Sequence, residues 1–337
     1  MRLLPALFCS ALLFAKTAAA QAPAPATDHG WVKQAQSWIS HLWSRDDDSA
    51  AWLARIGAAL RENNYQGTLV QTADGHVETV AVFHAFADGH ERERLVTLSG
   101  PHREVIRNDK MVMCVGTGDM PVGYDAGMGG TWNPDQVFAD VKRLQGYQAR
   151  LAGTGRVAGL DAQIVELRAK DDWRYGYRFW LEKQSGLPLQ ISLLDGSGHV
   201  LEQIFFTQLQ LGRKPADADL GPSTRDGLRR VQTLSQGQQS DPGWRVGSPP
   251  AGFSLRAARR LGPAVQLLYS DGLANISVYV EPVSPNASGA SAAHLGAVTA
   301  RSYWQGGRRV VAIGKVPELT VDYFARNVQP VPGKNGG

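Results

Sequence analysis

The sequence predicts an α+β protein whose main domain is one large antiparallel β-sheet with a few helices. First, Gly67 to Gly116 consists of short strand-like runs separated by the turn pairs Asp74-Gly75, Asp88-Gly89, Gly100-Pro101 and Asn108-Asp109. Asp-Gly pairs between such runs are typical of two-residue hairpin turns. Second, similar runs resume from Tyr147 to Gly212, so we expect about ten strands in one curved sheet.

Three stretches have the apolar spacing or the start signals of helices. Ser49 to Asn63 has a plausible N-cap at Ser49 and one apolar face, formed by Trp52, Leu53, Ile56, Ala59 and Leu60. Gly30 to Trp43 predicts an earlier helix, or instead a mobile leader. Asn133-Pro134 has the cap and first-turn proline of a helix that continues to about Leu144.

The start of the chain resembles an export signal. Met1 to Ala20 has a basic residue, a short apolar run and a terminal Ala-Ala-Ala, which predicts a secretory signal peptide cut after Ala20. The apolar run is shorter than the roughly 20 residues of a spanning helix. We therefore expect an exported, soluble chain. Its only remaining cysteine is Cys114, so no intrachain disulfide is expected.

A second, smaller domain is expected after a linker. Arg213 to Pro250 is rich in Gly, Pro, Gln and Ser and has few large apolar residues. Beyond it, strands are predicted within Tyr269 to Val280 and Arg308 to Ile313, a helix over Val316 to Asn327, and a flexible loop at Ser284 to Ala293. The predicted organisation is a signal peptide (1–20), a possibly helical leader (21–48), the large domain (49–212), a linker (213–243), a small α+β domain (244–328) and a disordered tail (329–337).

The net charge of +4 is distributed unevenly along the chain. Arg213 to Gly337 holds 15 Lys and Arg against 8 Asp and Glu, a net +7, and the preceding part is net −3. A basic C-terminal part in an exported protein suggests an anionic partner, either an acidic peptide or a phosphorylated lipid headgroup. A generally solvated surface is the alternative. Nucleic acid is a poor candidate outside the cytoplasm.

The charged run Glu91-Arg92-Glu93-Arg94 lies on a predicted strand. Side chains alternate between the two faces of a strand, so the two glutamates point one way and the two arginines the other. We therefore expect cross-strand ion pairs on a solvated rim rather than a converging catalytic cluster.

Several strands are apolar on both faces. Met111 to Val115, Phe205-Phe206 and the aromatic set Tyr175, Tyr177, Phe179 and Trp180 break the alternation of a sheet with one wet side. Helices can cover one apolar face. The other face needs a second protein layer, a partner or an apolar ligand.

Sequence patterns of catalysis, metal binding and cofactor binding are missing. There is no Gly-x-Ser-x-Gly motif, and Asp195 to Gly198 is better explained as a hairpin turn. Cys114 sits mid-strand among Met and Val and is expected to be buried and structural. The histidines have no metal-ligand spacing, and no glycine-rich phosphate loop occurs. The expectation is therefore a non-enzyme without a cofactor.

Five segments resemble one known family. They are "NYQGTLVQ", "ERERLVTLSGPHREVIRN", "FWLEKQSGLPLQISLLDGSGHVLEQIFFT", "LLYSDGLANISVYVE" and "VVAIGKVPELTV". In order, between about Ala51 and Val328, they are similar to the MucB/RseB family, periplasmic regulators of the envelope-stress sigma factor in Gram-negative bacteria.

The resemblance implies a fold and a mechanism. The large domain would be a curved antiparallel half-barrel with helices, as in lipoprotein carriers, joined to a smaller C-terminal domain. The protein would bind the periplasmic part of a membrane-spanning anti-sigma factor and shield it from the site-1 protease. Lipid or misplaced lipopolysaccharide would release it. If each ligand favours a different domain arrangement, each must weaken the other by the same factor.

Residues for these roles follow from the matching segments and the apolar strands. For partner contact the candidates are Tyr269, Ser270, Asp271 and Gly272, which alternatively form a plain turn, together with Arg308 and Arg309. For lipid the candidates are the apolar residues Met111, Met113, Phe179, Trp180 and Phe205, with Arg92, Arg94 and Arg103 for headgroup phosphates. The main rival function is a periplasmic lipid or lipoprotein carrier.

Overall fold

The computed structural model describes residues 48–109, 111–116, 144–224, 229–231, 243–284 and 288–331. The predicted signal peptide, the possible leader helix, nearly all of the predicted helix at 133–144 and the end of the tail lie outside the described residues. Among the described residues, no helix is long and apolar enough to cross a membrane.

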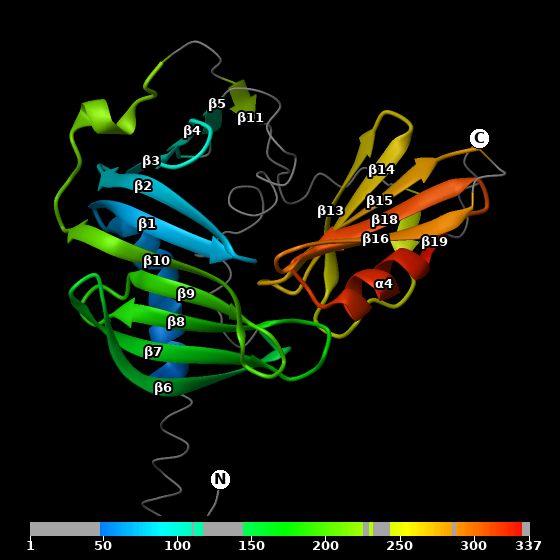
Figure 1. Cartoon of the computed structure of the whole chain (residues 1–337), viewed down its shortest axis with the longest axis horizontal. Coiled ribbons are helices and arrows are strands. Elements are labelled where there is room, and N and C mark those ends of the chain that lie inside the picture. The colour runs from blue at the N-terminus through cyan, green and yellow to red at the C-terminus, as the bar shows by residue number, and fades with distance from the viewer. Residues whose placement is uncertain are drawn as a thin grey trace, which may run out of the picture. The chain divides into compact units, whose positions relative to one another are not determined.

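The N-terminal part is built around one open antiparallel sheet of eleven strands, in the order β11-β5-β4-β3-β2-β1-β10-β9-β8-β7-β6 (Figure 1). Its strands are β1 (Tyr65–Ala73), β2 (His76–Ala87), β3 (His90–Thr97), β4 (Arg103–Asn108), β5 (Met111–Gly116), β6 (Tyr147–Val157), β7 (Leu160–Ala169), β8 (Gly176–Glu182), β9 (Pro188–Leu194), β10 (Val200–Leu211) and β11 (Arg229–Val231). Strands β1–β5 and β6–β10 each form a run of consecutive hairpins. Pairing of β1 with β10 joins the two runs into one sheet.

The hairpin turns have the backbone geometry that their residues predict. In Asp74-Gly75 and Asp88-Gly89 both residues have positive φ, at 48° and 74° and at 54° and 81°. This is the conformation of a type I′ turn, which matches the twist of the flanking strands. Ala158-Gly159 repeats it at 49° and 81° without an Asp or Asn. The turn after β6 therefore lies just before the predicted Gly159-Leu160-Asp161.

A helix at residues 48–62 packs on one face of this sheet. Leu53 and Ile56, both fully buried, contact a cluster that includes Val165, Leu167 and Phe179. Further along the helix, Ala59 and Leu60 belong to a second cluster with Tyr65, Val82, Leu187 and Phe206. We call this the helix face of the sheet and the opposite side of β6–β10 the outer face. The predicted apolar side of the helix is the side that the sheet covers.

The C-terminal part has its own sheet of six strands, in the order β13-β14-β15-β18-β17-β16. The strands are β13 (Ser254–Leu261), β14 (Ala264–Ser270), β15 (Asn275–Pro282), β16 (Gly289–Leu295), β17 (Val298–Gln305) and β18 (Arg308–Gly314), with helix α4 (Glu318–Arg326) and a short ribbon of β12 (Trp244–Val246) and β19 (Val328–Pro330). The predicted loop at Ser284 to Ala293 is wrong from Gly289 onward, because that segment pairs with β17 as an edge strand.

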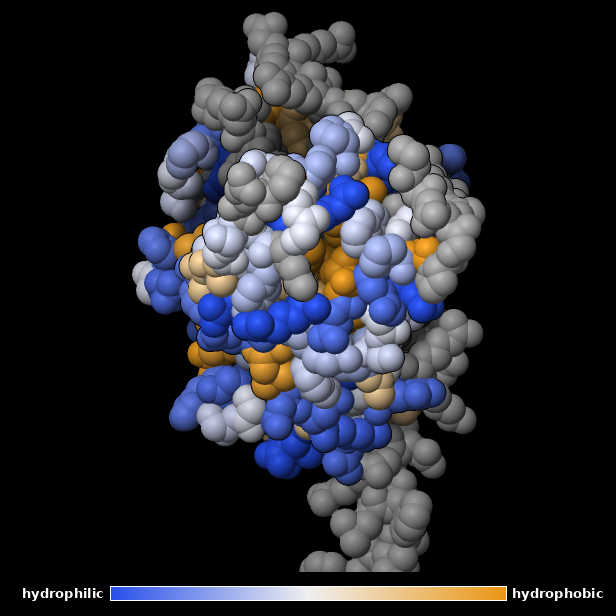
Figure 2. Space-filling model, turned by 90° about the vertical axis from the view of Figure 1, so that its right-hand side faces the viewer, coloured by the Kyte–Doolittle hydropathy of each residue, from blue (hydrophilic) through white to orange (hydrophobic). Residues whose placement is uncertain are grey.

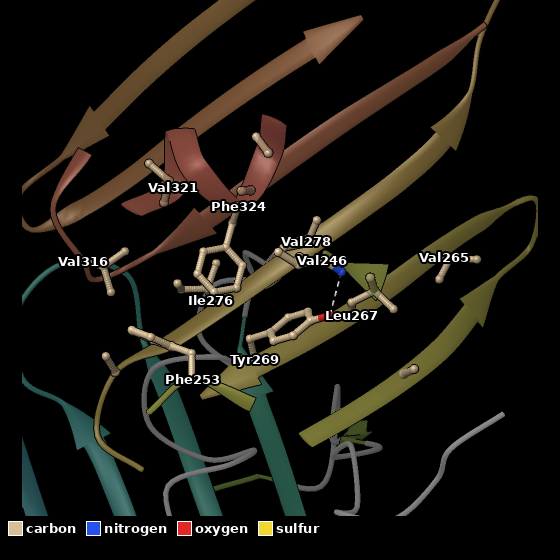
Figure 3. Packing of buried hydrophobic residues seen from close by; sticks show 14 residues of the cluster. Val246, Phe253, Val265, Leu267, Tyr269, Ile276, Val278, Val316, Val321 and Phe324 are labelled. Atoms are coloured by element: carbon tan, nitrogen blue, oxygen red, sulfur yellow. Dashed lines mark hydrogen bonds between the residues drawn. The ribbon is translucent and has the colours of Figure 1, made fainter. Parts of the chain in front are cut away.

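Helix α4 closes the core of the C-terminal sheet (Figure 3). Phe324 is fully buried, and its ring lies 5.5 Å from that of Phe253 and 5.2 Å from that of Tyr269, both nearly edge-on. The Tyr269 hydroxyl accepts a hydrogen bond from the Val246 N–H at 2.8 Å, which fastens the β12–β19 ribbon to the core. The predicted fold class is confirmed: a large, open, curved antiparallel sheet with few helices and a separate, smaller C-terminal sheet domain.

Replacing Phe324 by Ala should lower the free energy of unfolding by about 3–5 kcal/mol, because it leaves a cavity beside the rings of Phe253 and Tyr269. Chemical denaturation of the purified protein measures this loss. Leu319→Ala, on the exposed side of the same helix, is the matched control and should cost about 0.5 kcal/mol or less. Equal losses in the two variants would contradict the packing described here.

Candidate functional site

The segment Tyr269 to Gly272, predicted to contact a partner, comprises the last two residues of β14 and the first two residues of the turn to β15. The Asp271 carboxylate accepts the backbone N–H groups of Leu273 at 2.9 Å and Ala274 at 2.7 Å, and the Ser270 hydroxyl accepts that of Gly272. Gly272 has a φ of 111°, which favours glycine. Tyr269, Ser270 and Asp271 are all buried, so this turn presents little side-chain surface.

Asp271 is buried by Arg174, a residue of the loop before β8. Arg174 is fully buried, and its Nη1 donates to Asp271 Oδ2 at 2.5 Å. Its Nε and Nη2 donate to the two oxygens of Asp171 at 2.9 and 3.1 Å, and Nη2 also reaches the Ala251 carbonyl at 2.6 Å. The guanidinium lies 4.9 Å from the centre of the Phe253 ring. One cation thus binds residues from the N-terminal part and from the C-terminal part.

Burial raises the pKa of Asp271 above its ordinary range, against the opposing effect of the Arg174 charge. The Arg174 guanidinium and the backbone N–H groups of Leu273 and Ala274 offset part of this effect of burial. Further contacts accompany this pair: Lys315 Nζ donates to Glu202 at 2.6 Å, and the Thr320 hydroxyl donates to the Trp173 carbonyl at 2.9 Å. We call the set around Arg174, Asp271, Glu202 and Lys315 the domain junction.

The two arginines predicted for partner contact lie on β18. Arg309 donates to Glu281 on β15 through Nε and Nη2, at 2.8 and 2.5 Å. The Arg308 guanidinium lies 5.0 Å from the centre of the Trp244 ring. Both are accessible, unlike Asp271. The structure therefore does not bring the six predicted partner residues together into one surface.

The charged strand β3 divides its charges between the two faces of the sheet. Glu91 and Glu93 lie on the side of Arg107, which contacts both at 3.9 and 3.5 Å. Arg92 and Arg94 point the other way. Arg92 pairs with Asp217, and Arg94 donates to Glu104 at 3.0 Å. The expected cross-strand ion pairs are present.

Glu104 lies on the same side of the sheet as Arg92 and Arg94 and accepts the hydrogen bond from Arg94. Burial would raise its pKa, but hydrogen bonds from Arg94 and Ser223 outweigh burial and lower it to about 2. Arg103, the third arginine predicted for headgroups, donates to Glu78 at 2.5 Å. All three arginines predicted to bind headgroups are thus paired with carboxylates. Two residues of the expected linker, Asp217 and Ser223, bond to residues of the large sheet.

The apolar set predicted for lipid is divided between distant places in the sheet. Met111 and Met113 lie on β5, with six strands between them and β8. Phe179 is buried under the helix, whereas its neighbour Trp180 points to the outer face. Phe205 is also on the outer face, since Phe206 belongs to the helix-side core. Met111 and Met113 share one face of β5, and Trp180 and Phe205 share the outer face with one strand, β9, between them.

Next to Trp180 on the outer face lies a cluster of charge that the sequence patterns did not single out. Glu166 on β7 is almost fully buried, and three arginines donate to it: Arg150 at 2.8 and 3.2 Å, Arg168 at 2.8 Å, and Arg178 at 2.9 and 3.1 Å. Burial opposes ionisation of Glu166, but these arginines outweigh it and lower its pKa to about 2. The register pairs Glu166 with both Arg150 and Arg178. We call these four residues the arginine cluster.

Two family models match this chain, the MucB/RseB N-terminal domain at residues 48–224 and the MucB/RseB C-terminal domain at residues 238–329. The chain belongs to the MucB/RseB family. It is 33% identical to the sigma factor AlgU regulatory protein MucB of Pseudomonas aeruginosa, over 84% of this chain and 91% of that protein. It is 25% identical to the sigma-E factor regulatory protein RseB of Escherichia coli K12, over 83% and 90%.

Solved structures of MucB resemble this MucB/RseB chain over both sheet domains. The structure of the Pseudomonas aeruginosa MucA/MucB complex superposes with a TM-score of 0.71 and 32% identity, covering 84% of this chain and 99% of that chain. A second structure, of MucB in complex with periplasmic MucA, gives a TM-score of 0.69 and 31% identity, with 84% and 98% covered. The curated relatives are named as regulatory proteins and not as enzymes.

Asp271→Asn should destabilise the protein by about 3–5 kcal/mol, because the Arg174 charge would stay buried with one of its two carboxylate partners missing. The control is Asp217→Asn, which removes one partner of an exposed pair with Arg92 and should cost about 1 kcal/mol or less. Urea denaturation of both variants checks the difference. A loss below 1 kcal/mol in Asp271→Asn would show that the junction pair does not hold the domains.

Because of the arginine cluster, the free energy of unfolding should decrease at acidic pH. An unfolded glutamate titrates near 4.5 and Glu166 near 2, so its stabilising effect is complete above pH 4.5 and is lost as the pH falls toward 2. The effect is at most about 3 kcal/mol and less after solvent screening. The free energy of unfolding, measured from pH 7 to pH 2, should fall less steeply in Glu166→Gln than in the unmodified protein. Glu62→Gln, which removes a carboxylate from an exposed ion pair, is the matched control for the loss of one negative charge.

Proposed function

We propose that this protein is a periplasmic regulator that binds the periplasmic part of a membrane anti-sigma factor and so restrains the envelope-stress response. The observation that carries the proposal is the match to MucB over both sheet domains, including MucB bound to MucA. Bound in this way, the protein shields the anti-sigma factor from site-1 proteolysis. The predicted signal peptide at Met1 to Ala20 supports export to the periplasm.

Release by lipid or lipopolysaccharide is the second half of the proposal. The domain junction supplies a physical means, because Arg174 is bonded to both parts of the chain and its charge must stay paired. A ligand that favours a different arrangement of the domains must act against this pair. Peptide and lipid would then weaken each other by the same factor.

The domain junction also determines which of the candidate contact residues a partner can reach first. Because Asp271 is occupied by Arg174, it reaches a partner only when the junction opens. Arg308 and Arg309 are accessible in the present arrangement and suit an acidic peptide. We therefore assign the first contact to the two arginines and a role in the domain arrangement to the turn at Tyr269 to Gly272.

Calorimetric titration of the purified protein with the periplasmic segment of the same organism's anti-sigma factor tests this function. We expect saturable binding that lipopolysaccharide weakens, and slower cleavage of the segment by the site-1 protease when the protein is present. Arg308→Gln with Arg309→Gln should weaken binding about 30-fold, at roughly 1 kcal/mol for each of the two lost charge contacts. Arg256→Gln with Arg260→Gln is the control with the same change in net charge.

The outcomes separate the two candidate functions. Lipid binding without peptide binding would favour a periplasmic lipid or lipoprotein carrier. No binding of either ligand would overturn both. Binding of the peptide that lipopolysaccharide does not alter would retain the regulator and remove the linkage.

A further inference from the structure

The arginine cluster on the outer face has more positive charge than its own structure requires. One arginine suffices to neutralise Glu166 and can bind it through two parallel hydrogen bonds. Three arginines surround it instead, which leaves a net charge of +2 within one patch of β6, β7 and β8. Arg150, Arg168 and Arg178 are all partly exposed, so this excess charge faces solvent.

The guanidinium groups retain hydrogen-bond donors after they have bound Glu166. Each guanidinium carries five N–H donors in a planar fork. Glu166 accepts hydrogen bonds from both Nε and Nη2 of Arg150 and Arg178. From Arg168 it accepts a hydrogen bond from Nε alone. Each arginine therefore has further donors for a second anion.

The same carboxylate holds these donors in place. Because Glu166 is buried and lies on a central position of the β6–β7–β8 ladder, its bonds fix three long side chains around one point. Arginine in solution loses conformational entropy when it binds an anion, and a side chain already held by a carboxylate loses less. The cluster is thus organised before any ligand arrives.

Apolar side chains lie beside the cluster on the outer face. Trp180 lies two residues after Arg178 on β8, on the same face, and the Arg178 guanidinium is 6.0 Å from the centre of the indole ring. Trp180 is flanked by Ile164 on β7 and packs closely over Gly155, where an added Cβ would lie 3.2 Å from the indole. Phe205 lies two strands away on β10, opposite Val70 of β1, and Gln190 of β9 lies between it and Trp180 in the register. All of these large side chains are only partly buried.

We propose that the arginine cluster binds the phosphate of a lipid headgroup while the apolar side chains of Trp180, Ile164 and Phe205 contact the apolar part of the same lipid. A phosphomonoester has three terminal oxygens and up to two negative charges, which suits the donors that three neighbouring guanidinium groups retain and their excess charge of +2. The apolar side chains of Trp180 and Ile164 beside the cluster favour a lipid over a free phosphate. This inference rests on the lipid part of the proposed function and gives it a site different from the arginines of β3 and β4.

Vesicle co-sedimentation tests the site with phosphatidylcholine vesicles that contain phosphatidic acid, against vesicles of phosphatidylcholine alone. Arg150→Gln with Arg168→Gln removes two forks and leaves Arg178 on Glu166. We expect about 30-fold weaker binding to the acidic vesicles, since each arginine near an anionic surface contributes roughly a factor of five. Arg256→Gln with Arg260→Gln, the same charge change on β13, should bind within about twofold of the unmodified protein.

A charge-preserving variant, a phosphate titration and thermal unfolding distinguish the possible causes of weaker vesicle binding. Arg150→Lys with Arg168→Lys preserves charge and should still lose several-fold, because lysine lacks the fork. Calorimetry with inorganic phosphate alone distinguishes the lipid from the free ion: phosphate binding without vesicle binding would overturn the lipid assignment. Thermal unfolding of each variant confirms that the sheet is retained.

The failure of this site and the failure of the proposed function give different results. If the cluster variant binds acidic vesicles as well as the unmodified protein does, the site is wrong, whereas the anti-sigma titration still tests the function. Equal losses in the cluster variant and the β13 control would show a net-charge effect and also overturn the site. If the unmodified protein binds no acidic vesicles, both the site and lipid release are overturned.

Discussion

The burial of one positive charge, that of Arg174, constrains much of the structure around it. A buried guanidinium is tolerated only with its partners in place. This requirement accounts for Asp171 in its own loop, for the Ala251 carbonyl and for Asp271 in the β14–β15 turn. It also accounts for Gly146, where an added Cβ would overlap the guanidinium. Segments far apart in sequence therefore meet at one side chain.

Local chemistry predicted most of the fold, and long-range pairing determined the rest. Asp74-Gly75 and Asp88-Gly89 specify hairpins by themselves, because few other residue pairs adopt two positive φ angles. Helix 48–62 and helix α4 follow from apolar spacing. In contrast, residues 289–295 are small and polar enough to suggest a loop, and only the neighbouring β17 makes them a strand.

The candidate sites were harder to predict, because they depend on register. Alternation correctly separates Glu91 from Arg92, but it does not show that Arg107 or Asp217 lies opposite. Likewise Glu166 and Arg178 are ordinary strand charges until the β7–β8 register makes them neighbours. Arg174 gave no signal, since its partner Asp271 is 97 residues away. A single sequence contains no local trace of such contacts.

The pairing of β1 with β10 has a consequence for how the chain reaches this structure. Within β1–β5 and within β6–β10, neighbours are joined by short turns, so the loop-closure entropy of each hairpin is small. Tyr65 and Leu211, in contrast, pair across nearly the whole N-terminal domain. Contacts of such long sequence separation slow folding. We expect two half-sheets to form early and to join late, in an order that pulsed hydrogen exchange would resolve, with β1 and β10 exposed as unpaired edges until they meet.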